Sequence, residues 1–248
     1  MKGVDYMLLE NKVILITGGS RGIGKAVADK CLREGAKVVI DYKTSCEEIE
    51  TLVQQYDKNN IFTYKADVSK PGEVRKMIEY IKVNLGKIDG IVNNAGIITR
   101  TFDWKNISEE DWNKNINTNL LGTWNVMRFG IDIMEKGSSI VNISSIYGMF
   151  PEADELTYSI SKAGVIALTQ AIAKKIAPGI RVNVIAPGNT LTEMVPNSQR
   201  LCQIEEKTLL KRSANPDEIA NLIAYLLSEQ SSYITGCLIP IDGGYHVI

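Results

Sequence analysis

The stretch VILITGGSRGIG, residues 13–24, joins a short apolar run to a glycine-rich turn. The apolar residues Val13–Thr17 predict a buried strand, and the periodic pattern after the turn predicts a helix over Ile23–Arg33. Glycines permit a tight turn and a close approach of backbone to a ligand, and a helix N-terminus offers free N–H groups to an anion. A strand, a glycine turn and a helix in this order predict a dinucleotide pyrophosphate site, with the spacing G-x-x-x-G-x-G rather than the usual G-x-G-x-x-G.

The alternation of short apolar runs with longer amphipathic stretches continues along the chain. Further strands are expected at Lys37–Tyr42, Ile61–Lys65, Ile88–Val92, Ser139–Ile143, Arg181–Ile185 and Cys237–Pro240. Further helices are expected at Glu73–Leu85, Glu109–Arg128, Tyr158–Ile176 and Pro216–Leu227. These repeated units predict an α/β protein with one Rossmann-type domain over residues 1–248, a doubly wound parallel seven-stranded sheet covered by helices on both faces.

Three features mark helix ends and an irregular segment. Ser108 with Asp111 and Asn215 with Glu218 are typical of capping boxes at helix N-termini. Pro178 is expected to end the long helix before the next strand. Residues 189–211 lack a regular pattern and are too long for an ordinary loop, which indicates a functional lid or short helices.

Composition argues against several classes of function. The 248 residues carry a net charge of −1, which does not favour binding to nucleic acid or to a membrane surface. The four cysteines are far apart and His246 is the one histidine, so we expect no metal site. The chain shows no signal-peptide pattern and no apolar run of membrane-spanning length. We therefore expect a cytoplasmic protein with reduced thiols.

Polar residues follow three of the expected strands. They lie in Asp41–Lys43, Asp67–Val68 and Asn93–Gly96, and the carboxyl ends of parallel strands line the nucleotide pocket of such sheets. Asp67 is placed to accept a hydrogen bond from an adenine amino group, or alternatively to cap the following helix. Asn93 either contacts the nucleotide or braces neighbouring loops.

Tyr158 and Lys162 are spaced to share one face of a helix. The pKa of a free tyrosine is about 10, and a nearby ammonium group with a positive nicotinamide ring would lower it toward a value useful for proton transfer. Ser144 and Ser145 follow an apolar strand closely enough for a loop to bring a hydroxyl beside the phenol. Asn119 lies inside an expected helix, where a polar side chain indicates a buried water or a hydrogen bond between helices.

Taken together, these motifs resemble the short-chain dehydrogenase/reductase family in its branch of roughly 250 residues. The resemblance rests on residues 17–24, 93–96 and 241–244, on Pro187-Gly188, and on Asn119, Ser145, Tyr158 and Lys162. It implies an oxidoreductase that moves a hydride between a nicotinamide cofactor and a ketone or secondary alcohol.

The resemblance also implies a role for each site residue. Tyr158 would exchange the proton with the substrate oxygen, Ser145 would orient that oxygen, and Ser144 would not be the catalytic serine. Lys162 would hold the nicotinamide ribose and lower the pKa of Tyr158, and Asn119 would support a water in a proton relay. Tyr158, Lys162 and the following residues would contact the cofactor: Gly18, Ser20, Arg21, Gly22, Ile23, Gly24, Tyr42, Lys43, Asp67, Val68, Asn93, Ala95, Gly96, Pro187, Gly188, Thr190 and Thr192.

The end of the second strand bears on the choice of cofactor. In the family an acidic residue at the position of Tyr42 favours NAD, whereas Asp41 is expected to face the other way because successive strand residues alternate. Arg21 and Lys43 are placed to meet a 2′-phosphate, which favours NADP(H). NAD(H) is the alternative, since a one-residue bulge would present Asp41 instead.

The sequence says less about the substrate and the oligomeric state than about the cofactor. Glu152, Asp154 and Glu155 stand near the expected pocket mouth and favour a small neutral or cationic ketone or secondary alcohol, unless they simply face solvent. The chain is also similar to 3-oxoacyl-(acyl-carrier-protein) reductases, for which Lys136 occupies one docking position and Pro178 replaces the other. The glycine turn alone would also fit a non-catalytic nucleotide-binding regulator, and the Tyr158–Lys162 pair would fit an epimerase or dehydratase of the extended branch. The resemblance implies a homotetramer, with a dimer next.

Overall fold

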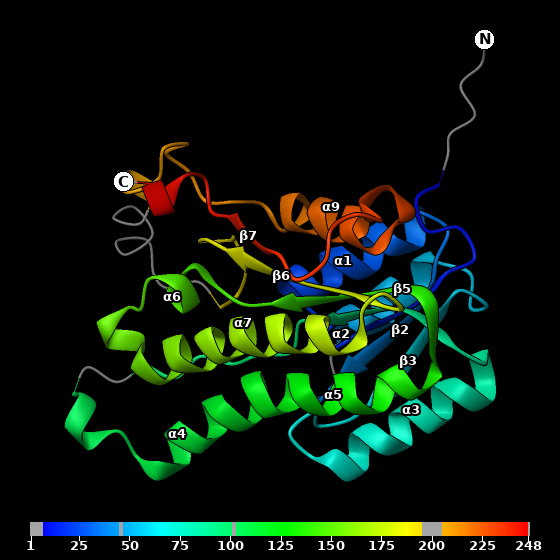
Figure 1. Ribbon diagram of the computed structural model, residues 1–248, viewed down its shortest axis with the longest axis horizontal. Coiled ribbons are helices and arrows are strands. Elements are labelled where there is room, and N and C mark those ends of the chain that lie inside the picture. Colours follow the sequence, from blue (N-terminus) through cyan, green and yellow to red (C-terminus); the bar gives the residue numbers. More distant parts are fainter. Residues whose placement is uncertain (1–6, 45–46, 101–102, 195–204, 248) are drawn as a thin grey trace.

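A parallel sheet forms the centre of the computed structural model, which describes residues 7–44, 47–100, 103–194 and 205–247 (Figure 1). Its seven strands lie in the order β3-β2-β1-β4-β5-β6-β7. Every neighbouring pair is parallel. The strands are β1 (Val13–Ile16), β2 (Lys37–Tyr42), β3 (Ile61–Lys65), β4 (Ile88–Asn93), β5 (Met134–Ile143), β6 (Arg181–Pro187) and β7 (Leu238–Ile241). The predicted doubly wound α/β fold is confirmed, and its strand order reverses between β1 and β4, where such sheets bind ligands.

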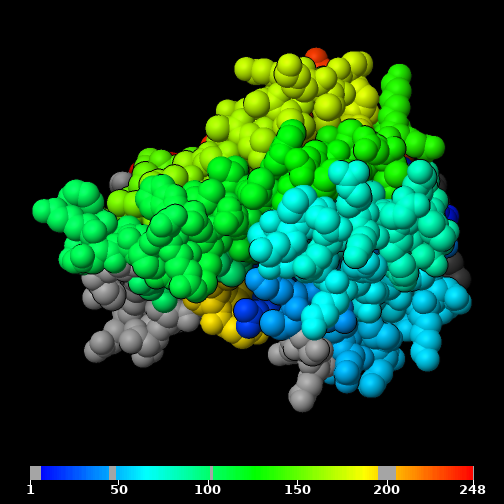
Figure 2. Space-filling model, turned by 90° about the horizontal axis from the view of Figure 1, so that it is seen from below, coloured from blue at the N-terminus to red at the C-terminus, as the bar shows by residue number. Residues whose placement is uncertain are grey.

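Helices cover both faces of the sheet. One face carries α1 (Gly22–Arg33), α2 (Glu47–Gln55) and α9 (Pro216–Leu227), and α1 lies beside α9 (Figure 1). The other carries α3 (Pro71–Leu85), α4 (Glu109–Asn115), α5 (Gly122–Gly130) and α7 (Leu156–Ile176), and Figure 2 shows α3, α5 and α7 side by side on the surface. The alternating side chains of the buried strands supply two apolar cores, one under each helical layer. None of the described helices combines the length and apolar content that crossing a bilayer requires.

Helix boundaries follow the capping chemistry of the sequence. Ser108 Oγ accepts a hydrogen bond from Asp111 N at 3.0 Å before α4. Asn215 and Glu218 form the expected capping box of α9, in which Asn215 N donates to Glu218 Oε2 at 2.9 Å. Helix α7 ends at Ile176, directly before Ala177 and Pro178.

Several elements differ from the sequence expectation. The helix expected over 109–128 is interrupted by a π-helical turn, Ile116–Leu121, between α4 and α5. Strand β5 begins at Met134 rather than Ser139. The sequence did not predict its first residues because they are exposed and show no alternation of apolar side chains. Helix α2 was not expected, and its buried contacts rest on Ile49 and Leu52. Of the irregular stretch 189–211, residues 195–204 lie outside the described residues.

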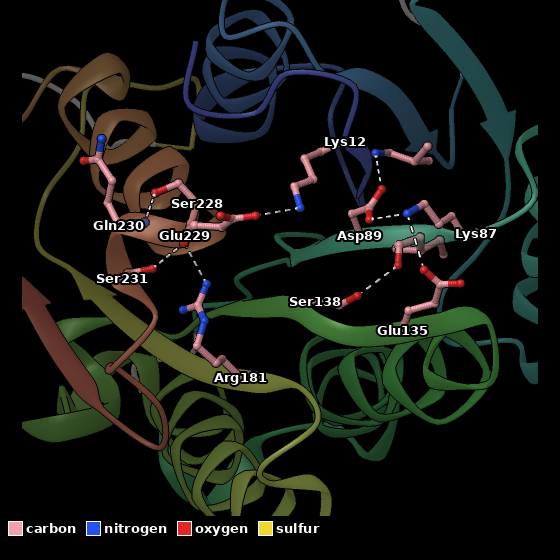
Figure 3. A network of polar contacts seen from close by, with 12 residues as sticks. Lys12, Lys87, Asp89, Glu135, Ser138, Arg181, Ser228, Glu229, Gln230 and Ser231 are labelled. Atoms are coloured by element: carbon pink, nitrogen blue, oxygen red, sulfur yellow. Dashed lines mark hydrogen bonds and ion pairs between the residues drawn. The ribbon is translucent and has the colours of Figure 1, made fainter. Parts of the chain in front are cut away.

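The amino ends of the strands are tied together by a polar network (Figure 3). Asp89 Oδ2 accepts from Val13 N at 2.9 Å, and its Oδ1 lies 3.0 Å from Lys87 Nζ. Arg181 Nη2 donates to two carbonyl oxygens at the C-terminal end of α9, both at 2.9 Å. These contacts connect the amino ends of β1, β4 and β6 to neighbouring segments of the protein.

Candidate active site

Tyr158 and Lys162 lie on the first turns of α7 and line a cavity at the carboxyl ends of β4, β5 and β6. Lys162 is 4 % exposed, and its Nζ donates to Ile143 O at 2.8 Å. This nitrogen lies 5.7 Å from the centroid of the Tyr158 ring. The structure thus places both side chains on the shared helix face that their spacing predicts.

The electrostatics of this pair are set by burial. Burial raises the pKa of Tyr158 to about 12, Glu155 and Tyr147 also raise it, and a hydrogen bond with the Ser145 hydroxyl lowers it. Burial lowers the pKa of Lys162 to about 8. The lowering of the Tyr158 pKa that we expected from Lys162 is not seen in the protein alone, where desolvation dominates. The phenol is therefore protonated at neutral pH.

The two serines after β5 have different partners. Ser144 Oγ donates to Lys162 O at 2.8 Å, so its proton is committed to the backbone of α7. Ser145 Oγ accepts from Tyr147 N at 3.2 Å, where it caps the short helix α6 (Ile146–Met149). Ser145 keeps its hydroxyl proton for the phenol or for a substrate oxygen, which agrees with the role that the resemblance implies.

Asn119 lies in the π-helical turn and is fully buried. Its Nδ2 donates to Ser161 Oγ at 2.9 Å and to Ile97 O at 3.0 Å, and its Oδ1 accepts from Ile97 N at 2.8 Å. A Cβ at Gly96 would lie 3.3 Å from Asn119 Oδ1 and 3.4 Å from Lys162 Nζ. Asn119 therefore fastens the loop after β4 to α7, and this loop passes Lys162 with little space for a side chain at Gly96.

The glycine turn after β1 has the backbone that a phosphate-binding loop requires. Gly18 and Gly22 adopt φ values of 61° and 52°. A Cβ at Gly24 would lie 2.4 Å from Gly18 O, so the turn packs too closely for any other residue. Asn94 Nδ2 braces the turn by donating to Thr17 O and Gly18 O, both at 2.9 Å.

The first turn of α1 fits an anionic group. Arg21 is its N-cap residue, makes no side-chain cap and is exposed. The first turn contains no acidic residue, so its free N–H groups and the positive end of the helix dipole remain available to phosphate oxygens. Ser20, in the glycine turn before α1, is partly exposed, and Ile23 lines the cavity.

The end of β2 keeps a regular register. Val38 to Tyr42 pair with β3 without a bulge. Asp41 is 2 % exposed, whereas Tyr42 is half-buried and packs against the core beside α1. Lys43 Nζ lies 2.8 Å from Asp67 Oδ2. Asp67 Oδ1 also accepts from Ser69 N at 2.9 Å in a local turn before α3, whose N-cap residue is Lys70 without a side-chain cap, so the alternative that Asp67 caps this helix is wrong.

The remaining predicted cofactor residues divide into two groups. Gly96, Pro187, Gly188, Thr190 and Thr192 line the cavity. The others support it, as the contacts of Asn93 with Asn142, of Ala95 with Thr17 and of Val68 with Asn125 show. Asn93 Nδ2 donates to Asn142 Oδ1 at 2.8 Å, so Asn93 braces the neighbouring strands β4 and β5 rather than loops, and it does not line the cavity.

Comparisons with known proteins identify the family to which this arrangement belongs. The family model described as Enoyl-(Acyl carrier protein) reductase matches residues 18–246. The 3-oxoacyl-(acyl-carrier-protein) reductase FabG of Thermotoga maritima is 39 % identical over 246 residues, covering 96 % of this chain and 99 % of that protein.

The chain belongs to the short-chain dehydrogenase/reductase family.

Solved structures of the family show the same architecture. A short-chain dehydrogenase/reductase from Brucella melitensis, titled a glucose/ribitol dehydrogenase, superposes with a TM-score of 0.92 at 29 % identity over 96 % of this chain and 98 % of that one. A short-chain dehydrogenase from Burkholderia cenocepacia in complex with NADP gives 0.92 at 29 % identity over 96 % and 99 %. This short-chain dehydrogenase/reductase is thus an NAD(P)-dependent oxidoreductase that interconverts a carbonyl and an alcohol of a small molecule.

Sequence reasoning missed several residues of the site. Ile98 after β4, Tyr147 after β5, Met194 after β6 and Tyr245 after β7 line the cavity. Arg100 also lines it and pairs with Glu155. These residues reach the cavity through loops whose course the sequence does not specify, whereas Asn94, which also lines it, belongs to the expected polar segment Asn93–Gly96.

Proposed function

We propose that this short-chain dehydrogenase/reductase reduces a ketone with NADPH and that Tyr158 is the proton donor. The observation that carries the proposal is the position of the Tyr158 phenol. It is held in a cavity wall, hydrogen-bonded to Ser145 and one helical turn from Lys162. A general acid must lie within hydrogen-bond reach of the oxygen that it protonates, and a phenol in the cavity wall beside the Ser145 hydroxyl is placed for this.

A bound nicotinamide cofactor supplies the hydride in this chemistry. The residues that would hold it are those that fit an anionic dinucleotide: the turn at 18–24 with the first turn of α1, and the cavity residues Pro187, Gly188, Thr190 and Thr192. Lys162 would contact the ribose end.

The side chains of the protein then handle the proton. Ser145 donates a hydrogen bond to the substrate carbonyl oxygen and holds it against the phenol. Tyr158 O–H gives its proton to that oxygen as the alkoxide forms, which leaves a phenolate on Tyr158. The Lys162 ammonium stabilises this phenolate, and a pKa of about 8 lets the amine exchange protons near neutrality. Asn119 supports the relay by fixing the loop beside Lys162.

The preference for NADP(H) rests on the charges at the end of β2. Arg21 is exposed and makes no ion pair with another described residue, and the Lys43 side chain is 66 % exposed although it contacts Asp67. Asp41 is buried under the turn with no bulge to present it. Arg21 and Lys43 would supply the positive charge that a 2′-phosphate needs, which supports the proposed preference.

Steady-state kinetics with a panel of ketones tests the proposal. Loss of the reduced-cofactor absorbance is expected with at least some ketones, and kcat/KM is expected to be higher for NADPH than for NADH. Arg21→Ala and Lys43→Ala should each weaken NADPH selectively and leave NADH little changed. Equal losses for the two cofactors would refute the phosphate contact, and no turnover of any ketone would refute the reaction.

A second candidate is the reduction of a 3-oxoacyl thioester on an acyl carrier protein. The similarity to the FabG of Thermotoga maritima favours it. Lys136 is exposed and available to an acidic carrier, whereas Pro178 stands at the other docking position. A carrier-bound 3-oxoacyl substrate with a kcat/KM far above that of the same thioester on N-acetylcysteamine would support this function.

We also propose a cytoplasmic homotetramer. Trp112 on α4, Leu121 in the π-helical turn and Ile160 on α7 are large apolar residues exposed on helix surfaces of the single chain. Light scattering coupled to size exclusion should give four times the chain mass; a monomer would refute the assembly.

A further inference from the structure

An ion pair that the proposed chemistry does not use forms part of the cavity wall. Arg100 lies in the loop after β4, and Glu155 directly precedes α7. Arg100 Nε donates to Glu155 Oε1 at 2.9 Å, and both residues line the cavity. The pair therefore links the loop after β4 to the helix that carries Tyr158.

The two partners differ in their exposure. The Glu155 side chain is 2 % exposed, whereas that of Arg100 is 31 % exposed. A buried carboxylate needs a charged, hydrogen-bonded partner, so Glu155 fixes the position of the Arg100 guanidinium. Glu155 is a positioning residue in this arrangement, and the exposed end of Arg100 is the part that a ligand can reach.

The guanidinium retains donors for a ligand. Arginine carries five N–H groups in a rigid fork, and Glu155 takes the Nε donor. Within the described ranges, Nη1 and Nη2 make no hydrogen bond to a protein acceptor. This planar pair of donors matches the two oxygens of a carboxylate or phosphate.

The charged residues that line the cavity also favour an anionic ligand. Its described charged residues are Arg100, Lys162 and Glu155, two cations and one carboxylate. Glu152 and Asp154, which the sequence placed near the pocket mouth, do not line the cavity. The repulsion of anions expected from these carboxylates therefore loses its basis, since the one carboxylate at the cavity is already paired.

We propose that Arg100 binds the substrate and that the substrate is a ketone, or the corresponding alcohol, bearing an anionic oxygen group, a carboxylate or a phosphate. The proposal rests on the proposed function for the reacting carbon and adds the group that the enzyme recognises elsewhere on the molecule. It replaces the expectation of a neutral or cationic substrate.

The test compares substrates that differ in one charge. We would measure kcat/KM for a series of 2-, 3-, 4- and 5-oxo acids, for the matching amides, and for oxoalkyl phosphates of similar length. At the best chain length the anion is expected to exceed the amide on the order of tenfold to a hundredfold, the range for hydrogen bonds to charged groups. The arm with the larger ratio, acid or phosphate, identifies the anionic group.

Variants assign the preference to Arg100. Because Arg100→Gln alone would leave a buried carboxylate without its cation, the main variant combines Arg100→Gln with Glu155→Gln. It should lose the preference for the anion over the amide. Arg33→Gln, which removes an exposed arginine from another ion pair on α1, is the matched control and should keep the wild-type ratio.

Two results would overturn the inference. One is that the wild-type protein has the same kcat/KM for the amide as for the acid. The other is that the double variant still prefers the anion to the amide. If no compound is reduced, the proposed function fails. Calorimetric binding of the oxo acid and its amide to the wild-type and double-variant proteins then decides the role of Arg100 separately.

Discussion

Asp41 offers a quantitative test of the fold around the glycine turn. Its carboxyl is 2 % exposed, and Oδ1 has no hydrogen-bond partner. Burial raises the pKa of Asp41 from 3.8 to about 7, although the backbone N–H groups of Gly18 and Ala66 lower it. Between these two pH values the folded protein keeps a proton that the unfolded chain has released.

The sign of the effect follows from this difference in bound protons. Stability decreases as pH rises from about 4 to about 7, because the folded state binds the extra proton in that window. Each pKa unit corresponds to about 1.4 kcal/mol, so the whole loss is on the order of 4 kcal/mol. Asp41→Asn should therefore match the wild-type stability below pH 4 and exceed it by up to about 4 kcal/mol above pH 7.

Urea unfolding between pH 4 and pH 8.5, at one protein concentration and without cofactor, measures this difference. Asp132→Asn, at an exposed carboxylate, is the control and should follow the wild-type protein within about 0.5 kcal/mol at every pH. A stability difference between Asp41→Asn and wild type that is constant across the pH range would refute the reasoning.

Two further predictions concern the site. Gly24→Ala should weaken dinucleotide binding at least tenfold in a fluorescence titration, because its Cβ would lie 2.4 Å from Gly18 O. Gly72→Ala is the control and should bind normally, because its Cβ would meet nothing within 4 Å. Equal binding by the two variants would contradict the packing argument. Ser145→Ala should lower kcat on the order of a hundredfold, because it removes a hydrogen bond to the substrate oxygen, and should retain cofactor affinity. Stopped-flow measurement of hydride transfer checks this prediction, and an unchanged rate would exclude Ser145 from the reaction.

Much of the fold follows from local sequence patterns. The buried strands have apolar, β-branched runs, and their carboxyl ends carry the polar residues, so the sheet and its functional edge could be predicted. Helix ends at Ser108, Asn215 and Pro178 followed from side chains with specific capping or terminating chemistry. The π-helical turn could not be predicted in this way, because its residues 116–121 form part of one continuous amphipathic pattern.

The candidate site likewise contains features that the sequence predicts and features that require the structure. The shared helix face of Tyr158 and Lys162 depends on one helical turn and could be predicted from their spacing, whereas their roles followed from the family resemblance. The pairing of Arg100 with Glu155 joins residues 55 positions apart through loops without a regular pattern, so it required the structure. The raised pKa of Tyr158 likewise depends on burial by distant segments.

The proposed mechanism depends on the Tyr158 phenol, which donates the proton during reduction. Single-turnover hydride transfer with Tyr158→Phe isolates this step, with cofactor binding measured in parallel. The mechanism predicts a loss on the order of a hundredfold to ten-thousandfold in the rate, with cofactor affinity within a few-fold of wild type. Hydride transfer by Tyr158→Phe at the wild-type rate would contradict it.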